Sequence, residues 1–190
     1  MDSKSILIAG VGGQGTLLAS KLLGRLLPDL GYDVKVSEVH GMSQRGGSVV
    51  TYVRCGEKVY SPVIDKGGAD IILAFEPLEA ARWFEYLKPG GTIVLNTART
   101  MPMSVLTGQE EYPEGVIEKL SALGAKVDAL DALKAAEEAG SSKAVNIVLL
   151  GLLSRSFDIA VEKWLEAIEA LVPAKLLEMN KKAFSIGRNA

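Results

Sequence analysis

Residues 5–38 read SILIAGVGGQGTLLASKLLGRLLPDLGYDVKVSE, and this stretch decides the fold. It opens with a short apolar run, residues 5–10, that is rich in β-favouring side chains and ends at a glycine. From Gly15 the apolar residues recur with helical spacing as far as the turn PDLG. A second alternating run, YDVKVSE, follows at residues 32–38. The pattern predicts a βαβ unit, in which the second strand returns beside the first.

The segment after this unit departs from a simple alternation of strands and helices. EVHGMSQRGG (38–47) contains three glycines and no helical period, so no second crossover helix is expected there. Two alternating runs come next, SVVTYVRC (48–55) and KVYSPVI (58–64), separated by Gly56 and Glu57. This spacing predicts a tight antiparallel hairpin and therefore a mixed sheet.

Strand and helix patterns alternate again in the rest of the chain. ADIILAF (69–75) and GTIVLN (91–96) are typical of buried parallel strands, and a helical segment that starts near Pro77 lies between them. Residues 97–115 are irregular and predict an excursion over the surface. Further helical segments and one short strand complete the chain. We therefore expect one domain, residues 1–190, with three α/β/α layers and a Rossmann-like, mostly parallel sheet that carries an added antiparallel hairpin.

The composition excludes several classes of protein. A hydrophobic fraction of 48% with a formal charge of −2 is typical of a soluble globular chain and gives no reason to expect nucleic acid or a membrane as partner. The apolar run 144–153 has about half of the roughly 20 residues that span a bilayer, and no export signal is visible, so a cytoplasmic location is expected. The single cysteine, Cys55, excludes an intrachain disulfide and any iron–sulfur cluster or structural zinc site held by this chain alone.

Residues 10–15, GVGGQG, match the pattern G-x-G-x-x-G between a strand and a helix, and we call them the glycine turn. Glycine lets the backbone approach a phosphate closely, and free N–H groups at the helix start favour an anion. The plain alternative is that these glycines only allow tight packing of strand and helix. Glu38 stands where a dinucleotide site places its ribose-binding carboxylate. The missing crossover helix argues against NAD(P), although a stand-alone NAD(P)-binding oxidoreductase stays an alternative.

Five stretches carry a resemblance to a known family: GVGGQGTLLASKLLG (10–24), KVSEVHGMSQRGGSVVTYVRCGEKVYSPVI (35–64), AFEPLEAAR (74–82), LKPGGTIVLNT (87–97) and SKAVNIVLLGLLS (142–154). Together they resemble, nearly end to end, the gamma-domain family of 2-oxoacid ferredoxin oxidoreductases. The form EVHGMSQRGGSVV, with histidine, is similar in particular to the beta subunit of indolepyruvate ferredoxin oxidoreductase. A gamma subunit of a pyruvate-type oxidoreductase is the alternative within the family.

The resemblance implies a reaction and a set of partners. A thiamine-dependent enzyme decarboxylates an aryl 2-oxoacid such as indolepyruvate, passes electrons through iron–sulfur clusters to ferredoxin, and releases an acyl-CoA. A large alpha subunit would hold thiamine diphosphate, magnesium and the clusters in a hetero-oligomer. This chain, inactive alone, would complete the active-site region and help bind CoA. A CoA- or nucleotide-binding regulatory module without catalysis is a further alternative.

Two elements of the sequence are suited to the phosphates of CoA. The first is the glycine turn, with the candidate residues Gly10, Gly12, Gly13, Gln14 and Gly15. The second is the end of the following glycine-rich loop, with the candidate residues Ser43, Gln44, Arg45, Gly46 and Gly47. Its glycines permit close backbone approach, and its arginine presents a planar fork of donors. Both elements follow strands of one predicted βαβ unit, so we expect them to face one crevice. We expect no catalytic residue and no metal site in this chain.

Other candidate residues have plainer interpretations. His40 has no nucleophile or second metal ligand paired with it in the sequence, so a loop-ordering or interface hydrogen bond is favoured over proton transfer. Glu76 and Glu79 follow a buried strand and could reach the cleft, although the helix dipole alone favours carboxylates in a first turn. Asn146, within an apolar helix, is expected to make a buried hydrogen bond.

Overall fold

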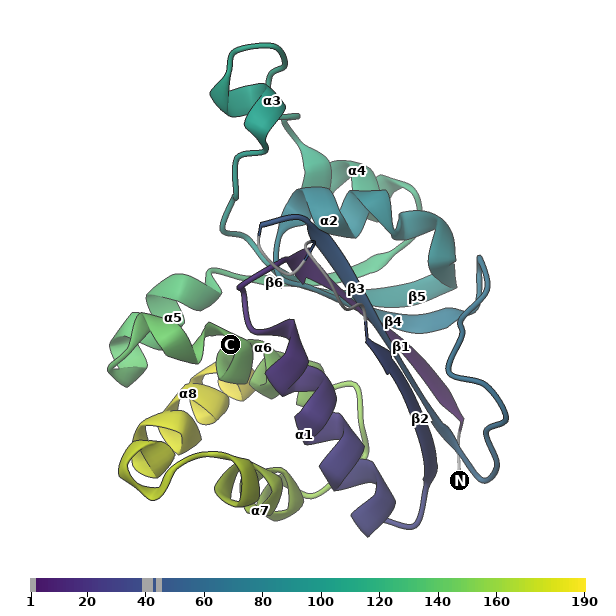
Figure 1. The fold of residues 1–190 in the computed structure, drawn as a ribbon, viewed down its shortest axis with the longest axis vertical. Helices are drawn as coiled ribbons and strands as arrows, with labels where there is room; N and C mark the ends of the chain where they lie inside the picture. Colours follow the sequence, from purple (N-terminus) through teal and green to yellow (C-terminus); the bar gives the residue numbers. More distant parts are fainter. Residues whose placement is uncertain (1–2, 39–42, 44–45) are drawn as a thin grey trace.

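The structure is a computed structural model that describes residues 3–38, 43 and 46–190. Its centre is a six-stranded sheet in the order β2-β3-β1-β4-β5-β6 (Figure 1). The strands are β1 (Lys4–Val11), β2 (Asp33–Glu38), β3 (Ser48–Gly56), β4 (Ala69–Ala74), β5 (Leu87–Asn96) and β6 (Lys126–Leu130). The first strand lies inside the sheet, as is usual in doubly wound α/β folds.

The sheet is mixed, as predicted, because one strand runs against the others. β1, β4, β5 and β6 pair in parallel. β3 pairs antiparallel with both β1 and β2, which places Val11 opposite Ser48 and Glu38 opposite Thr51. The prediction that the second strand lies beside the first is wrong, since β3 separates them.

The predicted pairing of residues 48–55 with residues 58–64 is also wrong, because residues 57–68 form no strand. β3 already has hydrogen-bonded neighbours on both edges, so no edge is left for a returning strand. Arg54 holds this segment instead, and its Nη1 donates to the carbonyl oxygens of Ser61 and Val63, both at 3.1 Å. The antiparallel addition to the sheet is therefore formed by β2 and β3.

Helices cover both faces of the sheet, which confirms the three-layer arrangement (Figure 1). One face carries α1 (Thr16–Asp29), α5 (Ala132–Ala139), α6 (Val145–Ser154), α7 (Val161–Leu171) and α8 (Leu177–Asn189). The other face carries α2 (Pro77–Arg82) and α4 (Val116–Ala122). Short 3-10 segments are η2 (Phe84–Tyr86), η3 (Ser142–Ala144) and η4 (Ala174–Leu176). The helix α3 (Met103–Leu106) stands away from both layers, within residues 97–115, which we call the arm.

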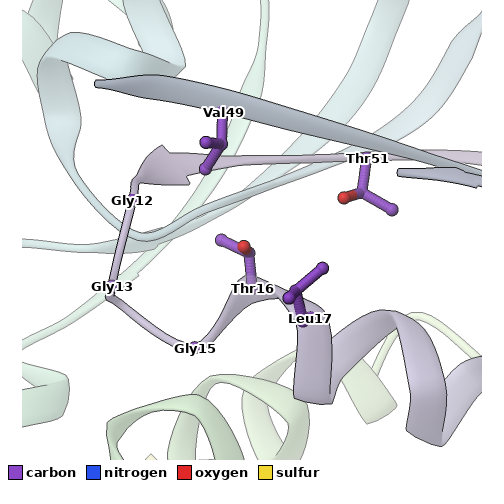
Figure 2. Close-up of a pocket in the computed structure, with 7 residues that line it drawn as sticks. All are labelled: Gly12, Gly13, Gly15, Thr16, Leu17, Val49 and Thr51. Carbon is purple, nitrogen blue, oxygen red and sulfur yellow. The ribbon is translucent and has the colours of Figure 1, made fainter. Parts of the chain in front are cut away.

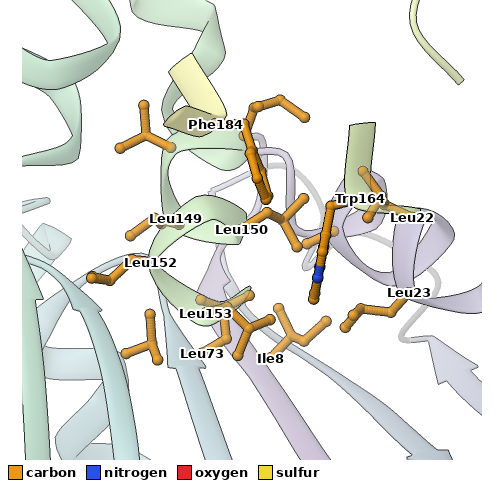
Figure 3. Close-up of a cluster of buried hydrophobic side chains, with 14 of the residues drawn as sticks. Ile8, Leu22, Leu23, Leu73, Leu149, Leu150, Leu152, Leu153, Trp164 and Phe184 are labelled. Atoms are coloured by element: carbon orange, nitrogen blue, oxygen red, sulfur yellow. The ribbon is translucent and has the colours of Figure 1, made fainter. Parts of the chain in front are cut away.

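Alternation along the strands divides the core into two clusters. In β1, Ile6 and Ile8 belong to the cluster on the side of α1, α6 and α7, whereas Leu7 between them belongs to the cluster under α2 and α4. Figure 3 shows the larger cluster. In it, Trp164 of α7 stacks on Phe184 of α8, with ring centroids 5.9 Å apart. Both helix layers are thus fixed to the sheet by continuous apolar contact.

The apolar run at residues 144–153 forms a buried helix, as predicted. Every residue of α6 from Asn146 to Ser154 is buried. Glycines let α6 and α8 approach each other closely, and a Cβ atom added at Gly187 would lie 1.9 Å from the carbonyl oxygen of Val148. Within the described residues, none of the helices combines the length and the apolar character needed to cross a bilayer.

Candidate functional site

The carboxyl ends of β1, β4, β5 and β6 meet at one edge of the sheet, where doubly wound α/β folds bind their ligands. The glycine turn lies at this edge, between β1 and α1. Gly13 and Gly15 have positive φ angles of 101° and 88°, a region that is unfavourable for a residue with a Cβ atom. The conformation of the turn therefore favours glycine at both positions.

The glycine turn is hydrogen-bonded to the end of the glycine-rich loop (residues 38–47). The Gly12 N–H donates to the Gly47 carbonyl oxygen at 2.8 Å, and the Gly12 carbonyl oxygen accepts from the Gly46 N–H at 3.2 Å. The Gly47 N–H donates to the Ser43 carbonyl oxygen at 3.0 Å. The structure thus brings Ser43, Gly46 and Gly47 beside the glycine turn. The other loop candidates, His40, Gln44 and Arg45, lie outside the described residues.

Only part of the glycine turn offers backbone donors to a ligand. The Gly12 N–H is occupied by Gly47, and the Gln14 N–H donates to the Val11 carbonyl oxygen at 3.1 Å. In the part of the chain that the structure describes, no hydrogen bond is made by the N–H groups of Gly13, Gly15, Thr16 and Leu17. The N–H groups of Thr16 and Leu17 are the first two of the helix α1, and the positive end of the helix dipole there favours negative charge.

A cavity of about 270 Å³ opens between the start of α1 and β3, and we call it the β3 pocket (Figure 2). Thr16 and Thr51 are only 7% and 3% exposed, and both side chains point into the space between helix and strand (Figure 2). Neither hydroxyl has a hydrogen-bond partner within the described ranges. The pocket therefore offers hydroxyl and N–H donors at the same place. It is lined by Gly12, Gly13, Gly15, Thr16, Leu17, Val49 and Thr51.

The two threonines are not among the residues predicted from the sequence. Thr51 lies in the alternating run SVVTYVRC, and its position in the pocket depends on β3 lying beside β1, which local patterning does not specify. Glu38, opposite Thr51 on β2, accepts a hydrogen bond from the Ser20 hydroxyl at 2.6 Å. Because β3 takes the place next to β1, Glu38 does not stand where a dinucleotide fold presents its ribose-binding carboxylate.

Two residues of the glycine turn have packing roles. A Cβ atom on Gly10 would lie 2.9 Å from both the Gln14 Oε1 and the Thr16 Cγ2 atoms, so a larger residue does not fit. The Gln14 side chain is used on both ends: Oε1 accepts from the Val11 N–H at 2.8 Å, and Nε2 donates to the Thr100 hydroxyl at 3.1 Å. Tight packing of the strand against the helix, without any ligand, therefore explains Gly10 and Gln14.

Glu76 fixes the arm to the sheet. It is 1% exposed, and its Oε2 accepts from the Glu79 N–H at 3.0 Å, which caps α2. Its Oε1 accepts from the Tyr112 hydroxyl and from the Thr100 N–H, the latter at 3.4 Å. The arm leaves and rejoins the body near these two residues, so one buried carboxylate holds both of its ends. Tyr112 lies in the irregular segment and has no signal in the sequence.

Glu79 is the second buried carboxylate at this edge, at 4% exposure. It accepts a hydrogen bond from the Ser48 hydroxyl and pairs with Arg82, whose Nε lies 3.3 Å from Oε1. Burial raises the pKa of Glu79 above its usual range, although the Ser48 and Arg82 contacts lower it. Glu79 and Arg82 line a further cavity of about 240 Å³ beside the base of the arm. The position of both glutamates is explained by contacts inside the protein.

Within the described residues, no group of three or more histidine, cysteine or acidic side chains is arranged to hold a metal ion. Cys55 lies on β3, is 2% exposed, and has a pKa raised by burial. A single buried thiol does not fit the four-thiolate ligand set of an iron–sulfur cluster.

Comparison with known proteins identifies the family. The model of the pyruvate ferredoxin/flavodoxin oxidoreductase family matches residues 5–190. The chain is 44% identical to the indolepyruvate oxidoreductase subunit IorB of Thermococcus kodakarensis, over 100% of this chain and 96% of the relative. It is 39% identical to the subunit of the same name from Archaeoglobus fulgidus, over 97% and 94% of the two chains.

Solved structures show the same fold. The gamma subunit of a keto/oxoacid ferredoxin oxidoreductase from Geobacter sulfurreducens superimposes with a TM-score of 0.73 at 24% identity, over 98% of this chain and 96% of that chain. A 2-oxoglutarate:ferredoxin oxidoreductase from Magnetococcus marinus, solved with 2-oxoglutarate, coenzyme A and succinyl-CoA, gives a TM-score of 0.76 at 22% identity. That match covers 100% of this chain and 31% of that chain. The resemblance noted in the sequence is thereby confirmed, and the chain belongs to the pyruvate ferredoxin/flavodoxin oxidoreductase family.

Proposed function

We propose that this chain is the beta subunit of an indolepyruvate ferredoxin oxidoreductase and acts as one gamma-type domain. The identity of 44% to an indolepyruvate oxidoreductase subunit, over the whole chain, is the observation that carries the proposal. In the reaction, an aryl 2-oxoacid, CoA and two oxidised ferredoxins give the acyl-CoA, carbon dioxide, two reduced ferredoxins and a proton. A cytoplasmic location, expected from the sequence, is part of the proposal, and fractionation of cells tests it.

The catalytic cofactors are assigned to a large partner subunit. Thiamine diphosphate would supply the decarboxylation chemistry, and iron–sulfur clusters would carry the electrons to ferredoxin. The single buried thiol of Cys55 does not supply the ligands of a cluster in this chain. In the solved 2-oxoglutarate:ferredoxin oxidoreductase the matching fold occupies 31% of a longer chain, so there it is one part of a larger protein. The chain described here would therefore work only in a hetero-oligomer.

We assign to this chain a share in binding CoA, at the glycine turn and the neighbouring loop. The N–H groups of Gly13 and Gly15, with those that begin α1, are suited to a phosphate, and the hydroxyls of Thr16 and Thr51 add donors in the β3 pocket. Gly10, Gly12 and Gln14 shape the turn in this proposal. Ser43, Gly46 and Gly47 form the opposite side. Gln44 and Arg45, which lie outside the described residues, complete the proposed set, in which the arginine would pair with a phosphate.

A substitution in the β3 pocket tests the CoA assignment. In the complex with its large subunit, Thr51→Val removes one buried hydroxyl and keeps the volume of the side chain. Hydrogen bonds to charged groups contribute about 1.5–3 kcal/mol, so the KM for CoA should rise about tenfold or more. Thr92→Val is the matched control, because Thr92 lies on β5 beside a cavity at the other edge of the sheet.

The readout is CoA-dependent reduction of a viologen dye, with gel filtration to confirm that the complex is intact. Arg45→Ala is a second variant and should also raise the KM for CoA. An intact complex with an unchanged KM in both variants would remove the CoA assignment. It would leave the assignment of the chain as a subunit in place.

A further inference from the structure

The arm (residues 97–115) exposes apolar side chains at its tip. Met103 and Leu106 of α3 are 71% and 66% exposed, and Met101, just before the helix, is 41% exposed. Neither hydrophobic cluster of the described core includes a residue of α3. Figure 1 shows this helix standing clear of both helix layers. Scattered apolar residues are common on protein surfaces, but three of them gathered on one projecting element indicate a contact surface.

The tip of the arm is held in one shape by its own hydrogen bonds. The Leu106 N–H donates to the Pro102 carbonyl oxygen at 3.0 Å, which closes the turn of α3. The Ser104 carbonyl oxygen accepts from the N–H groups of Gln109 at 2.8 Å and Glu110 at 3.1 Å. Side chains on a pre-formed turn lose less conformational entropy on binding than those of an unstructured segment. The arm is therefore suited to docking without refolding.

The base of the arm is tied to the ligand-binding edge of the sheet. Glu76 accepts hydrogen bonds from the Thr100 N–H and the Tyr112 hydroxyl, one at each end of the arm. The Thr100 hydroxyl accepts from Nε2 of Gln14, which belongs to the glycine turn. The Arg99 guanidinium lies 5.1 Å from the centroid of the Tyr112 ring and joins the outgoing and returning parts of the arm. Because the arm rises from this edge, a protein that covers the edge also contacts the arm.

The charge of the arm determines which kind of partner it complements. The arm carries three glutamates and one arginine. Glu110 and Glu111 come shortly after α3, both are exposed, and within the described residues neither forms an ion pair. In a two-fold contact between the tips of two copies, these carboxylates would face their equivalents, and like charges across an interface oppose association. An apolar surface bordered by lysine or arginine complements the tip instead.

We propose that the arm is the element by which this chain docks onto its large alpha subunit, in an apolar cleft of that subunit bordered by basic side chains. The identity of the partner rests on the proposed function. Met103 and Leu106 would form the buried centre of the contact, and Glu110 and Glu111 would lie at its rim. Docking of the arm would bring the glycine turn against the subunit that holds the thiamine.

Two exposed leucines provide a matched test. Leu106→Gln and Leu123→Gln change the same side chain at nearly equal exposure, 66% and 67%. Leu123 ends α4, near the amino end of β6 and away from the edge that carries the arm. Neither side chain is buried, so both variants should unfold at the urea concentration that unfolds the parent.

Binding of the full chain to the purified alpha subunit is measured anaerobically by biolayer interferometry. Leu106→Gln should raise the dissociation constant about tenfold or more, because the burial of one leucine side chain is lost. Leu123→Gln should leave the dissociation constant unchanged. Chymotrypsin cleavage at Leu106 should be slower in the complex than in the free chain.

Charge reversal tests the basic border of the cleft. Replacement of both carboxylates at the rim, by Glu110→Lys and Glu111→Lys, should slow association with the alpha subunit several-fold. Association of the parent should slow as salt is added, because salt screens the attraction between the exposed charges.

Four results would overturn the inference. These are a parent-like dissociation constant for Leu106→Gln, equal weakening by Leu123→Gln, association of the charge-reversed variant as fast as that of the parent, and a dimer of the isolated chain that Leu106→Gln converts into a monomer. The last result would assign the tip to a second copy of this chain.

Failure of the proposed function has a different signature. The alpha subunit would then bind the chain and Leu106→Gln would weaken the complex, but the complex would show no CoA-dependent reduction of a viologen dye with indolepyruvate. An active complex that Leu106→Gln leaves intact would remove the docking role alone. An alpha subunit that does not bind the parent chain would contradict both proposals.

Discussion

Gly13 and Gly15 share a backbone conformation and differ in their surroundings, which makes alanine at the two positions a matched pair. Both have φ near the left-handed region, at 101° and 88°. A Cβ atom at Gly13 would meet nothing within 4 Å, whereas at Gly15 it would lie 2.7 Å from the Asn146 Nδ2 atom. Alanine at the first position tests conformational strain alone. Alanine at the second also tests the close approach of α6 to the turn.

The expected losses in the free energy of unfolding follow from backbone strain and from overpacking. Left-handed backbone costs a residue with a Cβ atom about 1–2 kcal/mol, and we expect Gly13→Ala to lower the free energy of unfolding by that amount. A Cβ atom at Gly15 adds about 1–3 kcal/mol, because it displaces the Asn146 amide, whose Oδ1 accepts from the Ile147 N–H. The predicted loss for Gly15→Ala is therefore about 2–5 kcal/mol. Against a typical domain stability of about 5–15 kcal/mol, the variant should still fold.

Urea unfolding of the full chain, followed by circular dichroism, measures both losses. The m-values should stay constant, so that the shift in midpoint reports stability. In an Asn146→Ala background the obstruction is absent, and Gly15→Ala should then cost no more than Gly13→Ala. Equal losses for the two single variants, or no coupling between positions 15 and 146, would refute the close contact between the glycine turn and α6.

Three further predictions concern other parts of the fold. Gly187→Ala should lower the unfolding midpoint strongly, because its Cβ atom would lie 1.9 Å from a carbonyl oxygen of α6. Gly24→Ala, whose Cβ atom would lie 3.8 Å from its nearest neighbour, should instead stabilise the chain by up to about 1 kcal/mol through helix propensity. Equal unfolding midpoints for the two variants would contradict the close packing of α6 and α8. Tyr112→Phe should release one end of the arm and speed chymotrypsin cleavage at Met103 and Leu106, and an unchanged cleavage rate would argue against the clamp. Because burial raises the pKa of Glu79, the folded chain binds the carboxyl proton more tightly than the unfolded chain does. The stability of the parent relative to Glu79→Gln should therefore fall as the pH rises above about 4, by about 1.4 kcal/mol per unit of pKa difference between the folded and unfolded states. Urea unfolding at a series of pH values from acid to neutral measures this slope, and a slope of the opposite sign would contradict the prediction.

Local patterns predict most of the fold. The run SILIAG, the helix after Gly15 and the buried strands 69–75 and 91–96 follow from periodicity and from turn residues, and each appears in the structure. The place of β3 does not follow in this way. Its alternating pattern predicts a strand, but the neighbours of that strand depend on which strand edges are free elsewhere in the fold. In the structure β3 pairs with β1 on one side and with β2 on the other.

The sequence predicts less of the candidate site than of the fold. The glycine turn and the end of the glycine-rich loop are adjacent, and the motif marks the turn because its φ angles favour glycine. Thr51 has no sequence signal, because its place in the pocket depends on the position of β3 in the sheet. Tyr112 and the Asn146 amide gain their roles from contacts between segments that lie far apart in the chain, with Glu76 and Gly15.

Assembly with a large subunit is the central claim, and one measurement tests it most directly. The chain is produced anaerobically together with a candidate thiamine- and cluster-containing alpha subunit, and the purified material is assayed for CoA-dependent reduction of ferredoxin or a viologen dye. We predict a stable complex that oxidises indolepyruvate and phenylpyruvate faster than pyruvate, with no activity from either subunit alone. A chain that neither associates with the alpha subunit nor supports CoA-dependent reduction would contradict the account.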